Sequence, residues 1–300
     1  MRICNLSSPD YSSMYMRIAF TDTDYGAVQF QEWLSKYGDY EVVTHCDENC
    51  DFIICWGITQ QEKAWRALEK CPNTLIINYN WDCYEWSMQR RRGNLEYDFV
   101  KYGELLKKSI DIWVPSHAIG KRQKEWWNLD YHVIKSHSPM YDIPTSDERF
   151  VLNAQRDNPD DRRGWFERAC EELKIPYRST KHELEREEFR KVLASCSFQV
   201  SPYYEMSTGG LMILEGYYLG KPVLLSNSPY QGGGEYLGDR AEYFQHDDFE
   251  DLKRKIKDMW ENPCTVASDH KEWMRENYSE DRIAKDIHNR LQYLYERKNT

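Results

Sequence analysis

The sequence predicts an α/β protein of two domains, each built on a parallel sheet. Short apolar segments alternate with helix-like segments along both halves of the chain, a pattern typical of parallel sheets covered by helices on both faces. The chain has 300 residues, which fits two domains of about 150 residues each. Residues 138–148 (SPMYDIPTSDE) contain two prolines and form the clearest boundary between them.

The first half alternates strands and helices from its start. Strands are expected where short apolar or β-branched runs occur, at residues 2–6, 40–44, 51–56, 74–78, 110–114 and 131–135. Helices are expected where apolar residues recur at helical spacing, at residues 25–37, 60–70 and 121–127. We therefore expect residues 1–142 to form the first domain.

The second half repeats this alternation. Its expected strands are residues 150–155, 197–201 and 223–225. Its expected helices are residues 162–174, 183–195, 211–219, 249–260 and 279–297, the last with Ile283, Ile287, Leu291 and Leu294 facing inward. We assign residues 147–280 to the second domain and residues 281–300 to a C-terminal helix.

Composition excludes several classes of protein. The formal net charge is −10 and 30% of the residues are charged, and no apolar run approaches the ~18–20 residues of a membrane span. The N-terminus lacks the apolar segment of a signal peptide. Nine cysteines without a C-x-x-C pair indicate reduced thiols rather than a zinc site. We expect a cytoplasmic protein, in the host cytoplasm if it is viral, that requires no metal.

Residues 197–239 carry the clearest functional pattern: a strand, a polar loop, a helix, a second strand and a Gly-rich loop. Gly220 follows the helix where a positive φ suits glycine, and Pro222 stands where a helix cannot continue. The glycines at 232–234 are expected to form a loop that allows close approach of a ligand to the backbone.

The loop that opens this helix suits an anion. Ser207, Thr208, Gly209 and Gly210 precede the helix, and free N–H groups at a helix N-terminus favour phosphate. Glu215 lies one turn beyond Leu211, where a carboxylate could accept hydrogen bonds from ribose hydroxyls. The alternative is an ordinary strand–helix–strand unit with a capped, half-exposed glutamate.

Residues 207–225, STGGLMILEGYYLGKPVLL, resemble the nucleotide-sugar half of GT-B glycosyltransferases, in particular the retaining GT4 family. The resemblance covers residues 197–239. The rest of the chain matches the family mainly in the order and size of its expected elements. It implies two Rossmann-like domains and a C-terminal helix that crosses back to the first domain. It also implies a ribose contact for Glu215, a phosphate-cradling turn at Gly210 and Leu211, and no metal or cofactor besides the nucleotide-sugar co-substrate.

One position departs from the family. The family's first motif glutamate, which contacts the donor sugar, falls on Ser207, and the nearest carboxylate is Glu205. Either the loop shifts and Glu205 replaces that glutamate as a catalytic residue, or this protein handles the sugar differently.

Two arginines resemble the basic pair with which the family grips the diphosphate. Arg156 follows the first strand of the second domain, and Arg163 lies seven residues later, two more than in the family pattern. Arginine suits phosphate because its guanidinium donates two parallel hydrogen bonds. Arg156 is also expected to act in catalysis. The alternative for this segment is the acidic cap of a helix, through Asp160 or Asp161.

The acceptor is expected at the first domain. In the family the loop at this position faces the interdomain cleft and often holds a histidine near the transferred sugar. Here the loop after residues 74–78 holds Asn80, Trp81 and Asp82. Asp82 could orient an acceptor hydroxyl or accept its proton. The alternative is a turn cap on an aromatic surface.

Residues 85–135 differ in charge from the rest of the chain. They hold 10 Lys and Arg against 7 Asp and Glu, a net charge of +3, and Arg90 and Arg91 belong to one basic cluster. Such a face would suit an anionic acceptor such as a lipid-linked glycan, a membrane surface or nucleic acid. The alternative is a solvated helical face.

The resemblance thus implies a retaining transferase that moves a sugar from a nucleotide donor to a hydroxyl of a glycan or lipid-linked glycan. Two alternatives stay open: transfer to hydroxymethylated bases of viral (phage) DNA, and a catalytically silent GT-B protein used for binding, which the serine at 207 supports. The sequence specifies neither the donor base nor its sugar.

Overall fold

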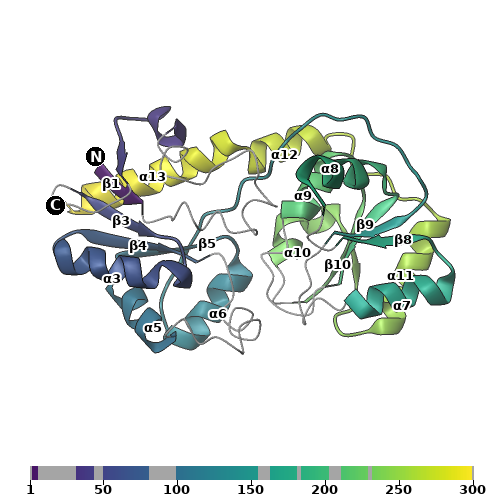
Figure 1. The fold of residues 1–300 in the computed structure, drawn as a ribbon, viewed down its shortest axis with the longest axis horizontal. Coiled ribbons are helices and arrows are strands. Elements are labelled where there is room, and N and C mark those ends of the chain that lie inside the picture. The colour runs from purple at the N-terminus through teal and green to yellow at the C-terminus, as the bar shows by residue number, and fades with distance from the viewer. Residues whose placement is uncertain are drawn as a thin grey trace. The chain divides into compact units, whose positions relative to one another are not determined.

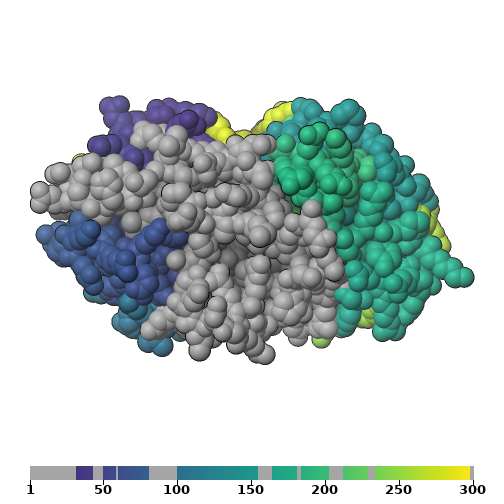
Figure 2. All heavy atoms as spheres, viewed as in Figure 1, coloured from purple at the N-terminus to yellow at the C-terminus, as the bar shows by residue number. Residues whose placement is uncertain are grey.

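The structure is a computed structural model. It describes residues 2–5, 32–43, 50–80, 99–154, 163–180, 184–202, 211–228 and 232–298, which Figure 2 draws in colour. The chain divides into two compact units. Among the described residues, the first unit holds those from 2 to 80, 99 to 137 and 280 to 298, and the second holds those from 138 to 279. The C-terminal helix therefore belongs to the first unit.

The first unit is a six-stranded parallel sheet with the order β2-β1-β3-β4-β5-β6. Its strands are β1 (Arg2–Asn5), β2 (Glu41–Val43), β3 (Phe52–Cys55), β4 (Leu75–Tyr79), β5 (Asp111–Val114) and β6 (His132–Val133). Its helices are η2 (Ile58–Gln60), α3 (Gln61–Lys70), α5 (Phe99–Lys108), α6 (His117–Trp127) and α13 (Glu280–Lys298). Every residue of β3 and β5 is buried, because a parallel sheet is covered on both faces.

Helix α13 lies along one side of this sheet and α3 and α5 along the other (Figure 1). The four residues predicted to face inward on α13 are at most 3% exposed, which confirms that prediction. Arg290 of α13 forms two hydrogen bonds with Asp111 of β5, at 2.6 and 2.8 Å. The indole N–H of Trp113 donates to the same carboxylate at 2.6 Å. An apolar stripe and the partly buried ion pair of Arg290 with Asp111 thus help to hold the helix on the first unit.

The second unit is a five-stranded parallel sheet with the order β11-β10-β9-β7-β8. Its strands are β7 (Val151–Asn153), β8 (Tyr177–Ser179), β9 (Phe198–Ser201), β10 (Val223–Ser226) and β11 (Glu242–Phe244). Its helices are α7 (Arg163–Leu173), α8 (Arg186–Ser195), α9 (Leu211–Tyr218), α10 (Gly232–Leu237), η3 (Gly238–Arg240), α11 (Phe249–Glu261) and α12 (His270–Tyr278).

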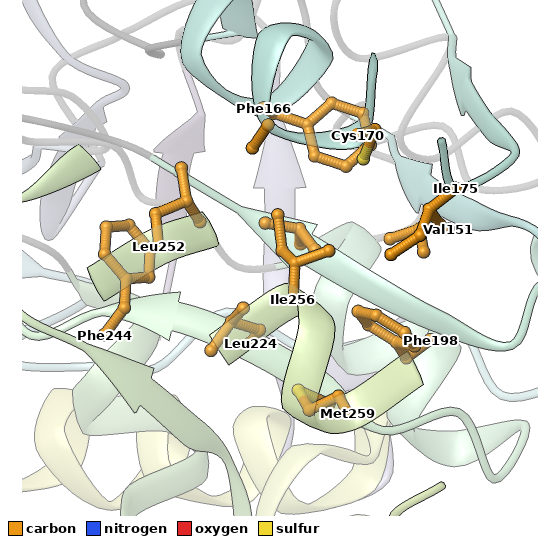
Figure 3. Packing of buried hydrophobic residues seen from close by; sticks show 12 residues of the cluster. Val151, Phe166, Cys170, Ile175, Phe198, Leu224, Phe244, Leu252, Ile256 and Met259 are labelled. Atoms are coloured by element: carbon orange, nitrogen blue, oxygen red, sulfur yellow. The ribbon is translucent and has the colours of Figure 1, made fainter. Parts of the chain in front are cut away.

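Alternation along these strands builds two separate core layers. Phe198 of β9 and Leu224 of β10 pack on one face with Phe166 of α7 and with Ile256 and Met259 of α11 (Figure 3). Val223 and Leu225 of β10 point to the other face, where they pack with α9, α10 and α12. Successive side chains of a strand point to opposite faces, so β10 contributes to both layers.

The predicted fold class, α/β with parallel sheets, is confirmed. Several elements differ from the sequence prediction. Residues 99–108 and 270–278 form the helices α5 and α12, which the sequence pattern does not predict. Helix α6 begins at His117, four residues before the predicted start, because the Ser116 hydroxyl accepts a hydrogen bond from the N–H of Ile119 and caps it.

The glycines at 232–234 are not a loop: they form the first turn of α10. Glycine disfavours a helix by about 1 kcal/mol relative to alanine. The second half of α10 holds this turn in place, because Tyr236 and Leu237 are buried in the core layer shared with α9 and α12. Tertiary packing here overrides the local preference of the sequence.

Candidate functional site

The candidate site is built around α9, the helix of the segment that resembles the nucleotide-sugar motif. Strand β9 ends at Ser201 and α9 begins at Leu211, so the segment between them follows the carboxyl end of a central strand, where α/β sheets bind ligands. Gly216 lets α9 approach the sheet closely. A Cβ on Gly216 would lie 1.7 Å from Nε2 of Gln199, a β9 side chain that is 1% exposed.

Many of the predicted site residues lie outside the described residues. They are Trp81, Asp82, Arg90, Arg91, Arg156, Glu205, Ser207, Thr208, Gly209 and Gly210. Arg163 is the first residue of α7 and Leu211 the first residue of α9. The structure describes the side chains of two predicted site residues, Glu215 and Asn80.

Glu215 is fully buried rather than half-exposed. The hydroxyl of Tyr141 donates a hydrogen bond to its Oε2 at 2.8 Å. Nη2 of Arg186, on α8, forms an ion pair with its Oε1 at 3.3 Å. The guanidinium of Arg190, one turn further along α8, stacks on the Tyr141 ring at 4.3 Å from the ring centroid. The ordinary capped glutamate that the sequence left open does not describe this environment.

The two oxygens of Glu215 differ in their hydrogen bonding. Oε2 accepts the bond from Tyr141. Within the described part of the chain, Oε1 is buried and accepts no hydrogen bond, although the charge of Arg186 lies close to it. A carboxylate oxygen can accept about two hydrogen bonds. Oε1 therefore keeps acceptor capacity for a hydroxyl donor.

Burial dominates the electrostatics of this cluster. It raises the pKa of Glu215 to about 7, against the opposing effects of Arg186, Tyr141 and Arg190. Burial also raises the pKa of Tyr141, and the neighbouring carboxylate of Glu215 raises it further, so this phenol stays protonated and donates. Glu215 thus changes charge near neutral pH.

Asn80 does not offer its amide to an acceptor in this structure. Its side chain is fully buried. Its Nδ2 donates to Gln123 and its Oδ1 accepts from the hydroxyl of Tyr102. Because both groups are occupied inside the unit, Asn80 supports the end of β4.

The basic region at 85–135 is partly neutralised where the structure describes it. Four of its basic side chains form ion pairs with nearby carboxylates: Lys101 with Glu62, Lys107 with Glu104, Arg122 with Glu125 and Lys124 with Asp130. Trp127 packs edge-on against Tyr102 at 6.2 Å between ring centroids, and its Nε1 would lie 2.5 Å from a Cβ on Gly103. This part of the region has the character of a solvated helical face.

Two negative findings concern only the residues that the structure describes. No group of three or more His, Cys, Asp and Glu side chains there could hold a metal ion. None of the helices there has the length and apolar character needed to cross a membrane.

Sequence reasoning missed Tyr141, Arg186 and Arg190. The spacing of the two arginines puts them on one face of α8, a signal present in the sequence. No local sequence pattern indicates that this face of α8 contacts Glu215, or that Tyr141 in the predicted domain boundary contacts Arg190 and Glu215.

Comparisons with known proteins place the fold. No protein-family model matches the chain, and no curated protein is similar to it in sequence. Solved structures are similar in fold over nearly the whole chain. Alr3699/HepE from Anabaena, solved with UDP and glucose, is 13% identical with a TM-score of 0.64, over 98% of this chain and 100% of that one.

Two further structures agree with it. A glycosyltransferase from Rickettsia africae is 13% identical with a TM-score of 0.63, over 100% of this chain and 99% of that one. Sucrose-phosphate synthase from Thermosynechococcus elongatus is 14% identical with a TM-score of 0.64, over 90% of this chain and 77% of that one. The chain therefore has the GT-B fold of these proteins, as its resemblance to the motif implied.

Proposed function

We propose that this protein is a retaining glycosyltransferase that takes a sugar from a nucleotide-sugar donor and transfers it to a hydroxyl acceptor. The single observation that carries the proposal is Glu215: a buried carboxylate on the helix of the nucleotide-sugar motif, with one oxygen that has acceptor capacity left. The likeness in fold to HepE, which was solved with UDP and glucose, supports it.

In this proposal Glu215 binds the ribose of the donor. Oε1 accepts a hydrogen bond from a ribose hydroxyl, while Oε2 stays bound to Tyr141. Because the carboxylate is fully buried, the ribose reaches it only when neighbouring chain moves aside. Neutral pH leaves part of the Glu215 population ionised, and the ionised form is the stronger acceptor.

The chemistry requires stabilisation of the leaving diphosphate. The bond between the sugar C1 and the diphosphate oxygen breaks, C1 passes through an oxocarbenium-like state, and negative charge builds on the diphosphate. N–H groups at residues 207–210, together with Arg156 and Arg163, would stabilise that charge. The acceptor oxygen bonds to C1 from the side of the leaving group, and its proton passes to the released diphosphate. This route needs no dedicated base and no metal. Asp82 would orient the acceptor hydroxyl.

For the acceptor we propose a glycan or a lipid-linked glycan rather than DNA. The ion pairs on α5 and α6 reduce the free positive charge that a DNA-binding face needs. The silent binding protein is the second candidate, since Ser207 replaces the family's glutamate. It predicts nucleotide binding without turnover.

A thermal-shift titration with UDP, GDP, ADP and CMP tests the donor site. A nucleotide at 100 times its Kd should add about 2.7 kcal/mol to the free energy of unfolding. We expect one nucleotide to stabilise the wild type and to lose that effect in Glu215→Ala. No shift with any of them refutes the proposal. The sugar nucleotide of the binding base is then tested for hydrolysis and transfer, and binding without either would favour the silent protein.

A further inference from the structure

Three segments that are separate in sequence meet at Glu215. Tyr141 lies in the connecting segment (residues 138–149), Arg186 and Arg190 lie on α8, and Glu215 lies on α9. Their contacts form a chain: Arg190 stacks on the ring of Tyr141, the hydroxyl of Tyr141 donates to Oε2 of Glu215, and Arg186 faces Oε1.

This chain of contacts restricts the carboxylate to one orientation. A glutamate has three rotatable side-chain torsions, and the hydrogen bond from Tyr141 fixes where Oε2 points. The stacked guanidinium of Arg190 in turn fixes the Tyr141 ring. Nη2 of Arg186 lies 3.3 Å from Oε1 and stabilises the negative charge there, and a carboxylate oxygen can accept about two hydrogen bonds. Arg186 therefore supplies positive charge beside Oε1, and Oε1 can still accept a hydrogen bond from a ligand.

We propose that Tyr141 and Arg186 are positioning residues of the nucleotide site, which hold Glu215 so that Oε1 accepts a hydrogen bond from a ribose hydroxyl. Neither residue needs to touch the nucleotide. The inference rests on the proposed function, and it adds two residues to the site that the nucleotide-sugar motif does not contain.

The same arrangement predicts how pH acts on binding. Among the residues that the structure describes, the charged and titratable groups that act on Glu215 are Tyr141 from the connecting segment and Arg186 and Arg190 from α8. All three lower the pKa of Glu215 against the effect of burial. Removing one of them raises that pKa further. The carboxylate of Glu215 then ionises only at higher pH, and the preference for ligands that carry the ribose hydroxyl should appear at higher pH as well.

The experiment compares ligands that differ only in one ribose hydroxyl. The Kd of UDP, 2′-deoxy-UDP and 3′-deoxy-UDP is measured by calorimetry on the wild type, Tyr141→Phe and Arg186→Gln, at several pH values on both sides of 7, where Glu215 titrates. If the thermal shift selects GDP or ADP, the corresponding deoxy pair is used. The ratio of two Kd values on one preparation does not depend on the fraction that is folded, so a destabilised variant stays informative.

Tyr177→Phe is the matched control. The hydroxyl of Tyr177 donates to the carboxylate of Glu171 at 3.0 Å on the exposed surface of the same unit. The substitution removes the same kind of bond away from Glu215, and the ligand preference of this variant should equal that of the wild type.

We expect the wild type to prefer UDP over one deoxy analogue by about 10- to 100-fold, the range for a hydrogen bond to a charged group. Tyr141→Phe and Arg186→Gln should lower that preference about tenfold at neutral pH and restore part of it at higher pH. Their affinity for the deoxy analogue should change little.

The outcomes separate this inference from the proposed function. A wild type that binds no nucleoside diphosphate refutes the proposed function. A wild type that binds UDP but ignores the ribose hydroxyls removes Glu215 from ribose recognition, and the inference falls with it. If the wild type prefers UDP over the deoxy analogue, and both variants show the same preference as the wild type at every pH, the proposed function stands and the inference is overturned.

Discussion

The titration of Glu215 should be measurable in the stability of the protein. Burial raises its pKa to about 7 in the folded chain, although Arg186 and Tyr141 oppose it, whereas the ordinary value for glutamate is 4.5. One pKa unit corresponds to about 1.4 kcal/mol. The difference therefore amounts to about 3 kcal/mol in the free energy of unfolding. Glu215→Gln keeps the shape of the side chain and removes the titration.

The direction of the effect is set by proton binding. Below about pH 4.5 both states carry the proton, and the contribution of Glu215 is fully present. Between about 4.5 and 7 the unfolded chain loses the proton while the folded chain keeps it, so stability falls as pH rises. Above about 7 both states are ionised and the contribution is gone.

Urea unfolding of the wild type and of Glu215→Gln between about pH 5 and 8 measures this difference. Every other titrating group is common to the two proteins, so the difference between their free energies of unfolding isolates Glu215. We expect the wild type to lose about 2–3 kcal/mol relative to the variant over this range. Parallel curves of unfolding free energy against pH would show that the effects of burial and of the arginines on the pKa of Glu215 cancel. A difference that grows with pH would show that the ion pair with Arg186 outweighs burial, which refutes the reasoning.

Three further changes test other parts of the structure. Arg290→Met should lower the free energy of unfolding by about 2–3 kcal/mol in a urea titration, because it leaves the largely buried Asp111 without its positively charged partner. A loss near zero, as for an exposed ion pair, would contradict this reasoning. Gly216→Ala should lower the free energy of unfolding by about 1–3 kcal/mol, because the overlap of its Cβ with Gln199 outweighs a gain of about 1 kcal/mol in helix propensity. Adding Gln199→Ala should recover most of the loss, whereas a Gly216→Ala variant as stable as the wild type would show that the Gln199 amide moves freely. Arg156→Ala should lower kcat for sugar transfer about 10²- to 10³-fold with a smaller change in KM, because in the proposed mechanism Arg156 stabilises the diphosphate as it leaves. Full turnover in steady-state kinetics would remove Arg156 from the proposed site.

The motif and the fold class were readable from the sequence because both depend on local patterns. Strand alternation and helical spacing operate over a few residues, and they placed β9, α9, β10 and the inward face of α13 within a few positions. The first turn of α10 could not be predicted in this way. Its glycines favour a loop locally, and the burial of Tyr236 and Leu237 in the core stabilises it as a helix.

The environment of Glu215 was decided by the tertiary structure. Its motif position is visible in the sequence, but its hydrogen bond partner Tyr141 lies 74 residues away along the chain. The folding of the second unit brings α8 and the connecting segment onto α9, and this excludes water from the carboxylate. The pKa of a carboxyl group depends on water and charge within a few ångströms in space. A sequence can therefore show which glutamate occupies the motif position, whereas its charge near neutral pH is fixed by neighbours that only the fold supplies.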